Sequence, residues 1–204
     1  MARGVRRAEL VSRPYAAWVG LALFFAACAL AGWPLPHDAI DWQPSLALGQ
    51  PWRAFTPIGV HYSSAHLIGN LAGIALAGVY GVAAMVPPRL AWAWLAAWPL
   101  THLGLLVRPE LLHYGGLSGV VHAGVAAIVV WVLATGRTRA QRWVSALVAI
   151  GFIAKLLSET PWGATFRHPE GWDITVAPLV HATGALAGAL CALVALTTRG
   201  RDTP

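Results

Sequence analysis

The chain has 204 residues, of which 57% are hydrophobic and 11% are charged, and its formal net charge is +6. Soluble domains carry roughly 25% charged residues, so this composition excludes an ordinary soluble domain and indicates a membrane protein. The basic residues form no cluster interleaved with aromatic residues, so the positive charge predicts no nucleic-acid partner.

Apolar runs dominate the chain. A helix needs about 20 apolar residues to cross the hydrocarbon core of a bilayer. Six runs reach or approach this length, at 15–33, 62–86, 90–107, 117–134, 143–157 and 176–197. We therefore expect an all-α, polytopic protein with a six-helix domain over 15–197. A cytoplasmic segment at 1–14 would precede this domain, and a cytoplasmic tail at 198–204 would follow it, with no separate soluble domain.

The distribution of charge predicts the orientation. If the N-terminus is cytoplasmic, only Arg53, Arg108 and Arg167 among the arginines fall in outer loops, and the inner segments hold Arg3, Arg6, Arg7, Arg13, Arg89, Arg137, Arg139, Arg142, Arg199 and Arg201. Most acidic residues then lie outside. The positive-inside rule thus predicts a multi-pass protein of the bacterial inner membrane with both termini in the cytoplasm.

The first span begins after basic residues and ends in "ALAG", which are features of a signal peptide. We expect the span to be retained, and its loss would not invert the other five. Cys28 in this span and Cys191 in the last one are interpreted as small apolar packing residues without a disulfide. The outer link at 34–61 carries Trp and scattered apolar residues, which favours a segment lying in the membrane interface.

Polar side chains inside the spans are few and costly, so each is a candidate for function. The second, fourth and sixth spans all run from outside to inside, and their polar residues come early. His66 and Asn70 are four residues apart on one face of the second span, Ser118 begins the fourth, and His181 lies about one turn into the sixth. These four side chains are predicted at a similar depth, just below the outer surface.

Small residues indicate close helix packing. Gly69 and Gly73 in the second span, and Gly184 and Gly188 in the sixth, have the GxxxG spacing that allows helices to approach closely in lipid. His181 shares a face with Gly184 and Gly188. We therefore expect the sixth span to press this histidine against the fourth.

The predicted cluster matches the chemistry of acyl transfer. A serine hydroxyl needs a base within hydrogen-bond reach, which His181 would supply to Ser118. The oxyanion of the tetrahedral intermediate needs donors, and the His66 and Asn70 side chains and the Ser118 backbone N–H are suitable. Gly116 and Gly119 on either side of the serine allow the tight turn and the close approach of substrate backbone.

The motifs that carry these residues resemble the rhomboid intramembrane serine proteases. They are "WRAFTPIGVHYSSAHLIGN" with His61, His66 and Asn70, then "GLSG" at 116–119, then "HATGALAG" at 181–188. The resemblance implies a six-helix core, a Ser118–His181 dyad without a third acid, oxyanion donors at His66 and Asn70, and a supporting role for His61 in a water-filled cavity.

One position departs from the familiar bacterial pattern, which has a tyrosine four residues after the nucleophile where this chain has His122. The segment "GLSGVVHAG", together with the compact length of the chain, resembles the rhombosortase branch of the family. That resemblance implies membrane-anchored protein substrates with a C-terminal Gly-Gly motif, a transmembrane helix and a basic tail, cleaved at the periplasmic face. His122 would then have a supporting role beside His181.

Alternatives from other classes stay open. The chain could be a general rhomboid protease with other substrates, an inactive rhomboid-like binding protein, or a haem protein ligated by pairs among His66, His102, His122 and His181. No HExxH metalloprotease motif occurs, and we expect neither a metal nor an organic cofactor.

The other polar groups have plainer interpretations. Lys155 and Glu159 are one helical turn apart and could be a functional pair, but we expect a snorkelling contact at the interface. We expect His102 to be a hydrogen-bonded residue of the helix bundle, and His113 and His168 to be solvated.

Overall fold

The computed structural model describes residues 2–136, 138–171 and 173–198, and this part of the chain is helical with irregular connections. Its α-helices are α1 (Ala2–Gly32), α2 (His37–Ile40), α3 (Ser64–Ala83), α4 (Pro88–Leu103), α5 (Ser118–Thr135), α6 (Arg139–Ser158) and α7 (Pro178–Thr197). Short 3-10 helices follow α2 at η1 (Pro44–Leu46), η2 (Pro51–Ala54) and η3 (Thr56–Gly59), and η4 (Gly104–Val107) extends α4. Six of the helices are long and apolar enough to cross a membrane, so the predicted all-α, six-span architecture is confirmed.

Local sequence explains where the helices begin. The Ser63 side chain accepts a hydrogen bond from the backbone N–H of His66 at 3.1 Å and so caps α3. Thr138 and Gln141 form a capping box at the start of α6. Proline is the first residue of both α4 and α7, where its missing N–H costs no intrahelical bond. The starts of α3 and α7 matter most, because these first turns carry His66 and His181.

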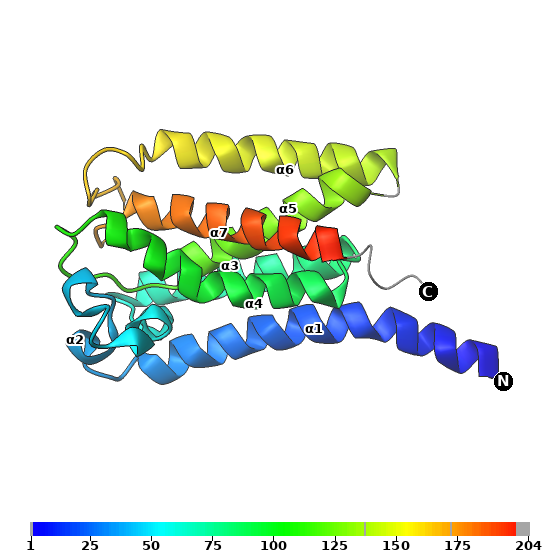
Figure 1. The fold of residues 1–204 in the computed structure, drawn as a ribbon, viewed down its shortest axis with the longest axis horizontal. Coiled ribbons are helices and arrows are strands. Elements are labelled where there is room, and N and C mark those ends of the chain that lie inside the picture. The colour runs from blue at the N-terminus through cyan, green and yellow to red at the C-terminus, as the bar shows by residue number, and fades with distance from the viewer. Residues whose placement is uncertain (1, 137, 172, 199–204) are drawn as a thin grey trace.

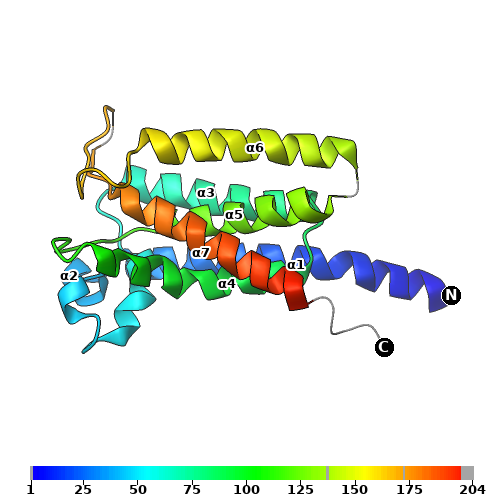
Figure 2. The same ribbon diagram turned by 45° about the horizontal axis from the view of Figure 1, so that its top comes forward.

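Helix α5 is the centre of the bundle and packs against α3, α4, α6 and α7. Helix α1 covers α3 and α4 on one side, and α6 lies on the opposite side (Figure 1). Ser145 is the buried residue of α6 in the described part of the chain, so this helix is the most loosely held of the spans. Helix α1 begins and α7 ends at one end of the bundle, and α2 lies at the other (Figures 1 and 2).

Helix α1 is an integral part of the hydrophobic core. The buried Trp18 donates a hydrogen bond from Nε1 to the Val86 carbonyl oxygen at 3.0 Å, and its ring stacks on that of Trp94 with 5.4 Å between centroids. Phe25, on the same face of α1 two turns further along, packs against Trp94 as well. Removal of this helix as a signal peptide would expose these large rings, which favours the prediction that the first span is retained.

Helices α5 and α7 approach each other closely through glycine. A Cβ atom added at Gly184 would collide with the backbone of Gly119, and one at Gly188 would collide with the backbone of Ala123. The Thr183 hydroxyl also donates to the Thr101 carbonyl oxygen of α4 at 2.9 Å. The close packing that the GxxxG spacing predicts between the fourth and sixth spans is thus confirmed, and it fixes the position of His181 beside α5.

The segment that follows α1 is ordered by a buried ion pair. Arg53 Nη1 lies 3.0 Å from Asp41 Oδ1, and the same guanidinium donates to the carbonyl oxygens of Asp38 and Asp41. Trp42 and Tyr114 exchange two backbone hydrogen bonds, of 2.7 and 2.9 Å. This segment is therefore tied to the chain that leads into α5, and it positions the approach to Ser118.

Candidate active site

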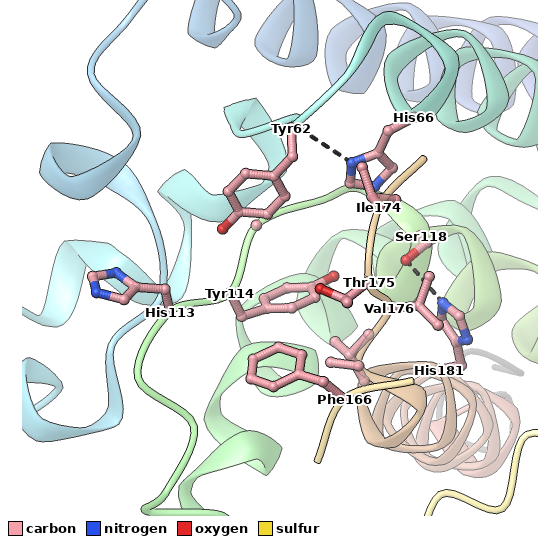
Figure 3. A pocket seen from close by; sticks show the side chains of 13 residues that line it. Tyr62, His66, His113, Tyr114, Ser118, Phe166, Ile174, Thr175, Val176 and His181 are labelled. Atoms are coloured by element: carbon pink, nitrogen blue, oxygen red, sulfur yellow. Dashed lines mark hydrogen bonds between the residues drawn. The ribbon is translucent and has the colours of Figure 1, made fainter. Parts of the chain in front are cut away.

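Ser118 and His181 meet at the end of the bundle where α2 lies. Ser118 is the first residue of α5, and His181 lies in the first turn of α7. The Ser118 Oγ atom and the His181 Nε2 atom are 2.9 Å apart, which is hydrogen-bond distance (Figure 3). A serine hydroxyl and an imidazole in this contact can form a nucleophile and its general base.

The turn that presents Ser118 requires glycine. Gly116 has a φ of +138°, which residues with a Cβ atom rarely adopt, and its N–H donates to the Pro57 carbonyl oxygen at 2.9 Å. A Cβ atom there would also approach His66 Nε2 to 3.0 Å. Gly119, one residue past the serine, packs against Thr101 and Val180. Both glycines therefore allow the start of α5 to sit against the neighbouring helices.

His66 and Asn70 supply hydrogen-bond donors near the serine. Both are buried, on one face of α3, and both line a cavity that Ser118 and His181 also line. The backbone N–H of Tyr62 points at His66 Nδ1 at 3.4 Å, so in the neutral ring the proton is on Nε2. The Asn70 Nδ2 atom is buried and has no hydrogen-bond partner among the described residues. An unpaired buried donor is costly, and an oxyanion in the cavity would satisfy it.

His61 lies behind His66. Its ring is buried, with its centroid 4.9 Å from that of His66, and neither ring nitrogen has a partner in the described part of the chain. Burial, followed by the neighbouring His66, lowers the pKa of His61 to about 4. The His61 imidazole is therefore neutral at pH 7 and is a polar, uncharged neighbour of the candidate oxyanion donor His66.

His122 stacks on His181. Their ring centroids are 4.2 Å apart and their planes differ by 13°. His122 Nδ1 lies 2.6 Å from the Ser118 carbonyl oxygen, so this nitrogen carries the proton and donates. The ring thus covers one face of the candidate base, at the position where the familiar bacterial pattern has tyrosine.

The Lys155–Glu159 pair differs from the sequence prediction. The two side chains do form an ion pair, at 2.9 Å, but both also reach inward. Glu159 Oε2 lies 2.7 Å from His181 Nδ1, and Lys155 Nζ lies 2.7 Å from His122 Nε2. The interpretation of this pair as an interfacial contact only is therefore wrong, because both side chains contact the histidines beside Ser118. The cause is the rotation of α6 about its axis, which sequence spacing does not fix.

The electrostatics of Glu159 agree with its contacts. Burial alone raises the pKa of the Glu159 carboxyl, but hydrogen bonds and charge from His181 and Lys155 outweigh this effect and lower the pKa to about 2. The side chain is 22% exposed. A carboxylate is thus present beside His181 throughout the neutral range.

Two cavities meet at the serine. One, of about 250 Å³, extends toward Tyr62, His113, Tyr114 and Phe166 (Figure 3). The other, of about 680 Å³, extends toward α6 and the loop that carries Arg167 and His168. His66, Ser118 and His181 line both cavities, so a substrate segment could pass the nucleophile from either side.

Three other histidines make no hydrogen bond with Ser118 or His181 among the described residues, although His113 and His168 line the two cavities. His102 is buried and its Nδ1 lies 2.7 Å from the Ala54 carbonyl oxygen, which confirms a hydrogen-bonded bundle residue. His113 and His168 are both exposed as predicted, and His113 Nδ1 also lies 2.6 Å from Asp41 Oδ2. The stacked rings of His122 and His181 leave no gap for a porphyrin between them, which disfavours that pair as haem ligands.

Comparison with protein-family models identifies the class. Residues 48–198 match the rhomboid domain, and the chain belongs to the rhomboid family. It is therefore a multi-pass membrane protein of a family of intramembrane serine proteases that act on membrane-protein substrates. Searches of curated proteins and of solved structures each found no match.

Proposed function

We propose that this protein is an intramembrane serine endopeptidase in which Ser118 is the nucleophile and His181 is the general base. The observation that carries the proposal is the 2.9 Å contact between Ser118 Oγ and His181 Nε2 at the mouth of two cavities. The unpaired Asn70 amide in the same cavity supports it, because such a donor fits a developing oxyanion.

The reaction follows from these contacts. Ser118 Oγ attacks the scissile carbonyl carbon while its proton passes to His181 Nε2. His66 Nε2–H, Asn70 Nδ2–H and the Ser118 backbone N–H donate to the oxyanion, and the positive end of the α5 dipole favours the negative charge. His181 then protonates the leaving amine as the C–N bond breaks. The acyl-enzyme passes its acyl group to water or to another amine, and no cofactor takes part in our scheme.

For the substrate, we propose a membrane-anchored protein with a C-terminal Gly-Gly motif, a transmembrane helix and a basic tail, as in the rhombosortase branch. The "GLSGVVHAG" segment and the presence of His122 in place of tyrosine support this branch. The 250 Å³ cavity beside Ser118, lined by aromatic and aliphatic side chains, would receive the substrate residues next to the scissile bond.

We propose that residues 15–197 form the membrane domain in the bacterial inner membrane, with the active site open to the periplasm. The distribution of arginine supports this orientation. Segment 1–14 would be cytoplasmic. The predicted cytoplasmic tail at 198–204 lies, apart from Thr198, outside the described residues.

The test is co-expression with a Gly-Gly-tailed substrate and with a matched substrate in which both glycines are replaced by valine. Ser118→Ala and His181→Ala should abolish processing, and Ser118→Ala should also abolish labelling by a fluorophosphonate probe. The exposed Ser45 on η1 provides a matched control, since it lines neither of the two cavities at Ser118.

The outcomes separate the proposals. Processing that persists in both Ser118→Ala and His181→Ala would refute the catalytic assignment. Equal cleavage of the Gly-Gly and Val-Val substrates would refute the substrate class and favour a general rhomboid protease. Mass spectrometry of the released product distinguishes a free carboxylate from an acyl group transferred to an amine.

A further inference from the structure

Glu159 connects helix α6 to the proposed base. Its carboxylate bridges two groups, with Oε2 2.7 Å from His181 Nδ1 and Oε1 2.9 Å from Lys155 Nζ. Glu159 lies at the C-terminal cap of α6, while His181 is on α7. The contact therefore joins two helices that otherwise touch little.

The contact determines which nitrogen of His181 carries the proton. A carboxylate accepts only, so the 2.7 Å contact requires a proton on Nδ1. His181 Nε2 is then free to accept the Ser118 hydroxyl proton across 2.9 Å. Without an acceptor at Nδ1, the neutral ring could place its proton on Nε2, and it would then be unable to act as a base toward Ser118.

The contacts of His122 and Lys155 allow a donor and an acceptor to be assigned in each hydrogen bond around His181. His122 Nδ1 donates to the Ser118 carbonyl oxygen, so its Nε2 accepts from the Lys155 ammonium at 2.7 Å. The same ammonium donates to Glu159 Oε1. Lys155 Nζ also lies 3.2 Å from His181 Nδ1. Both nitrogens carry protons, so this contact is not a hydrogen bond. The Glu159 carboxylate accepts from both nitrogens, which compensates for their mutual repulsion.

We propose that Glu159 is a positioning residue for this protease, as the third member of a Ser118–His181–Glu159 triad. This inference rests on the proposed function. As the bond from Ser118 Oγ to the carbonyl carbon forms, the hydroxyl proton moves to His181 Nε2 and makes an imidazolium. Glu159 stays ionised and stabilises that cation through the Nδ1–H hydrogen bond, and the Nε2 proton later leaves with the amine.

Lys155 has the opposite electrostatic effect on the base. It holds Glu159 and His122 in place, but its positive charge disfavours a second cation at His181. In the described part of the chain, His66 from α3, His122 from α5, and Lys155 and Glu159 from α6 interact with His181. The cavities that His181 lines are also lined by Tyr62, His113 and Tyr114, and by Arg167 and His168 from the loop before α7. Removing either charge on α6 should therefore shift the pH dependence of activity, and the two shifts should have opposite signs.

The experiment measures kcat, KM and the pH profile of cleavage by purified protein in detergent, for Glu159→Gln, Glu159→Asp and Lys155→Met. Glu159→Gln should lower kcat by about 10²- to 10⁴-fold with KM nearly unchanged, since loss of the carboxylate in a serine protease triad has effects up to that size. The acidic limb of the pH profile of Glu159→Gln should move to lower pH, because the His181 imidazolium is harder to form without the carboxylate. Lys155→Met should move that limb to higher pH, and Glu159→Asp should restore part of kcat.

Ser118→Ala and His181→Ala are measured alongside, so that the two proposals fail in different ways. Activity in both of those variants would refute the proposed function. Inactivity of both, combined with native kcat and a native pH profile in Glu159→Gln, would refute the role of Glu159 alone. If Glu159→Gln fails to fold, as judged by thermal unfolding, Glu159→Asp decides, because its shorter side chain withdraws the carboxylate from His181 Nδ1: a native kcat together with a native pH profile in Glu159→Asp overturns the inference.

Discussion

At the scale of single residues, the end of the bundle where α2 lies concentrates buried polar groups that apolar helices would otherwise avoid. Asn70 and His61 have buried nitrogens without partners among the described residues, and both lie beside His66. Such groups lower the stability of the fold unless a ligand or a transition state engages them. We therefore expect substitutions of Asn70 and His61 to change catalytic activity and the stability of the fold by different amounts.

Asn70→Ala tests the proposed oxyanion donor. Because the amide would bind the oxyanion more strongly than the ground-state carbonyl, the change should lower kcat by about 10²- to 10³-fold with little effect on KM. Steady-state cleavage in detergent measures both constants. Ile68 is on the same helix and is 65% exposed, so Ile68→Ala is the matched control and should be near native. Equal activity of the two variants would contradict the role of Asn70.

His61 makes a testable contribution to the pH dependence of stability. Its pKa is lowered from 6.5 to about 4, so between these values the folded state binds fewer protons than the unfolded state. Stability therefore falls as the pH falls through this window. His61→Gln should make the thermal midpoint in detergent less dependent on pH between about 6.5 and 4. The exposed His168 is the control, and a slope in His61→Gln equal to that of His168→Gln would contradict the prediction.

At the scale of the elements, the α5–α7 contact positions the base against the nucleophile. Ser118 and His181 lie at the start of these two helices, and Gly184 and Gly188 bring their backbones together. Helix α6 is held more loosely, yet it supplies Lys155 and Glu159. The Tyr80 and Ser145 hydroxyls, 2.6 Å apart, connect α6 to α3 near the other end of the bundle.

Gly188→Ala tests the close approach of α5 and α7. The added methyl group would collide with the Ala123 backbone, so the helices must separate, at a cost of about 1–3 kcal/mol. The thermal midpoint and the cleavage rate should both fall, because α7 carries His181. Gly151 on α6 has nothing within 4 Å of an added Cβ, so Gly151→Ala should be neutral or slightly stabilising. Similar midpoints for the two variants would exclude tight packing at Gly188.

At the scale of the whole molecule, an even number of spans brings the start of α1 and the end of α7 to the same side, opposite to the candidate site (Figure 1). The arginines of the described inner segments, such as Arg89 and Arg139, lie on the side away from Ser118. A membrane that attracts these cations to its cytoplasmic face would leave the two cavities open to the periplasm.

Single-cysteine labelling tests this orientation in a Cys28→Ala, Cys191→Ala background. Leu48 in the outer segment is 99% exposed, and Arg139 begins α6 on the opposite side. A membrane-impermeant maleimide should label Leu48→Cys in intact spheroplasts, but label Arg139→Cys only after the membrane is permeabilised. The reverse pattern would show that the orientation is inverted.

The sequence by itself determined the membrane class, the six spans and the common depth of Ser118, His181, His66 and Asn70. These depend on the length of apolar runs, the alternating direction of successive spans and the spacing of residues along one helix, all of which are local properties. Family motifs added chemical roles to the same residues. The packing of the fourth and sixth spans was also predictable, because GxxxG spacing leaves few other ways for helices to meet.

Only the tertiary structure decided which groups surround the base. The inward contacts of Glu159 and Lys155, the stacking of His122 on His181 and the burial of the Asp41–Arg53 pair all depend on how each helix is rotated and which neighbour it meets. Lys155 and Glu159 were visible as a charged pair at the outer end of a span, but the same spacing suits an interfacial pair equally well. A rotation of α6 changes no local pattern in the sequence, yet it would carry the carboxylate from His181 into lipid.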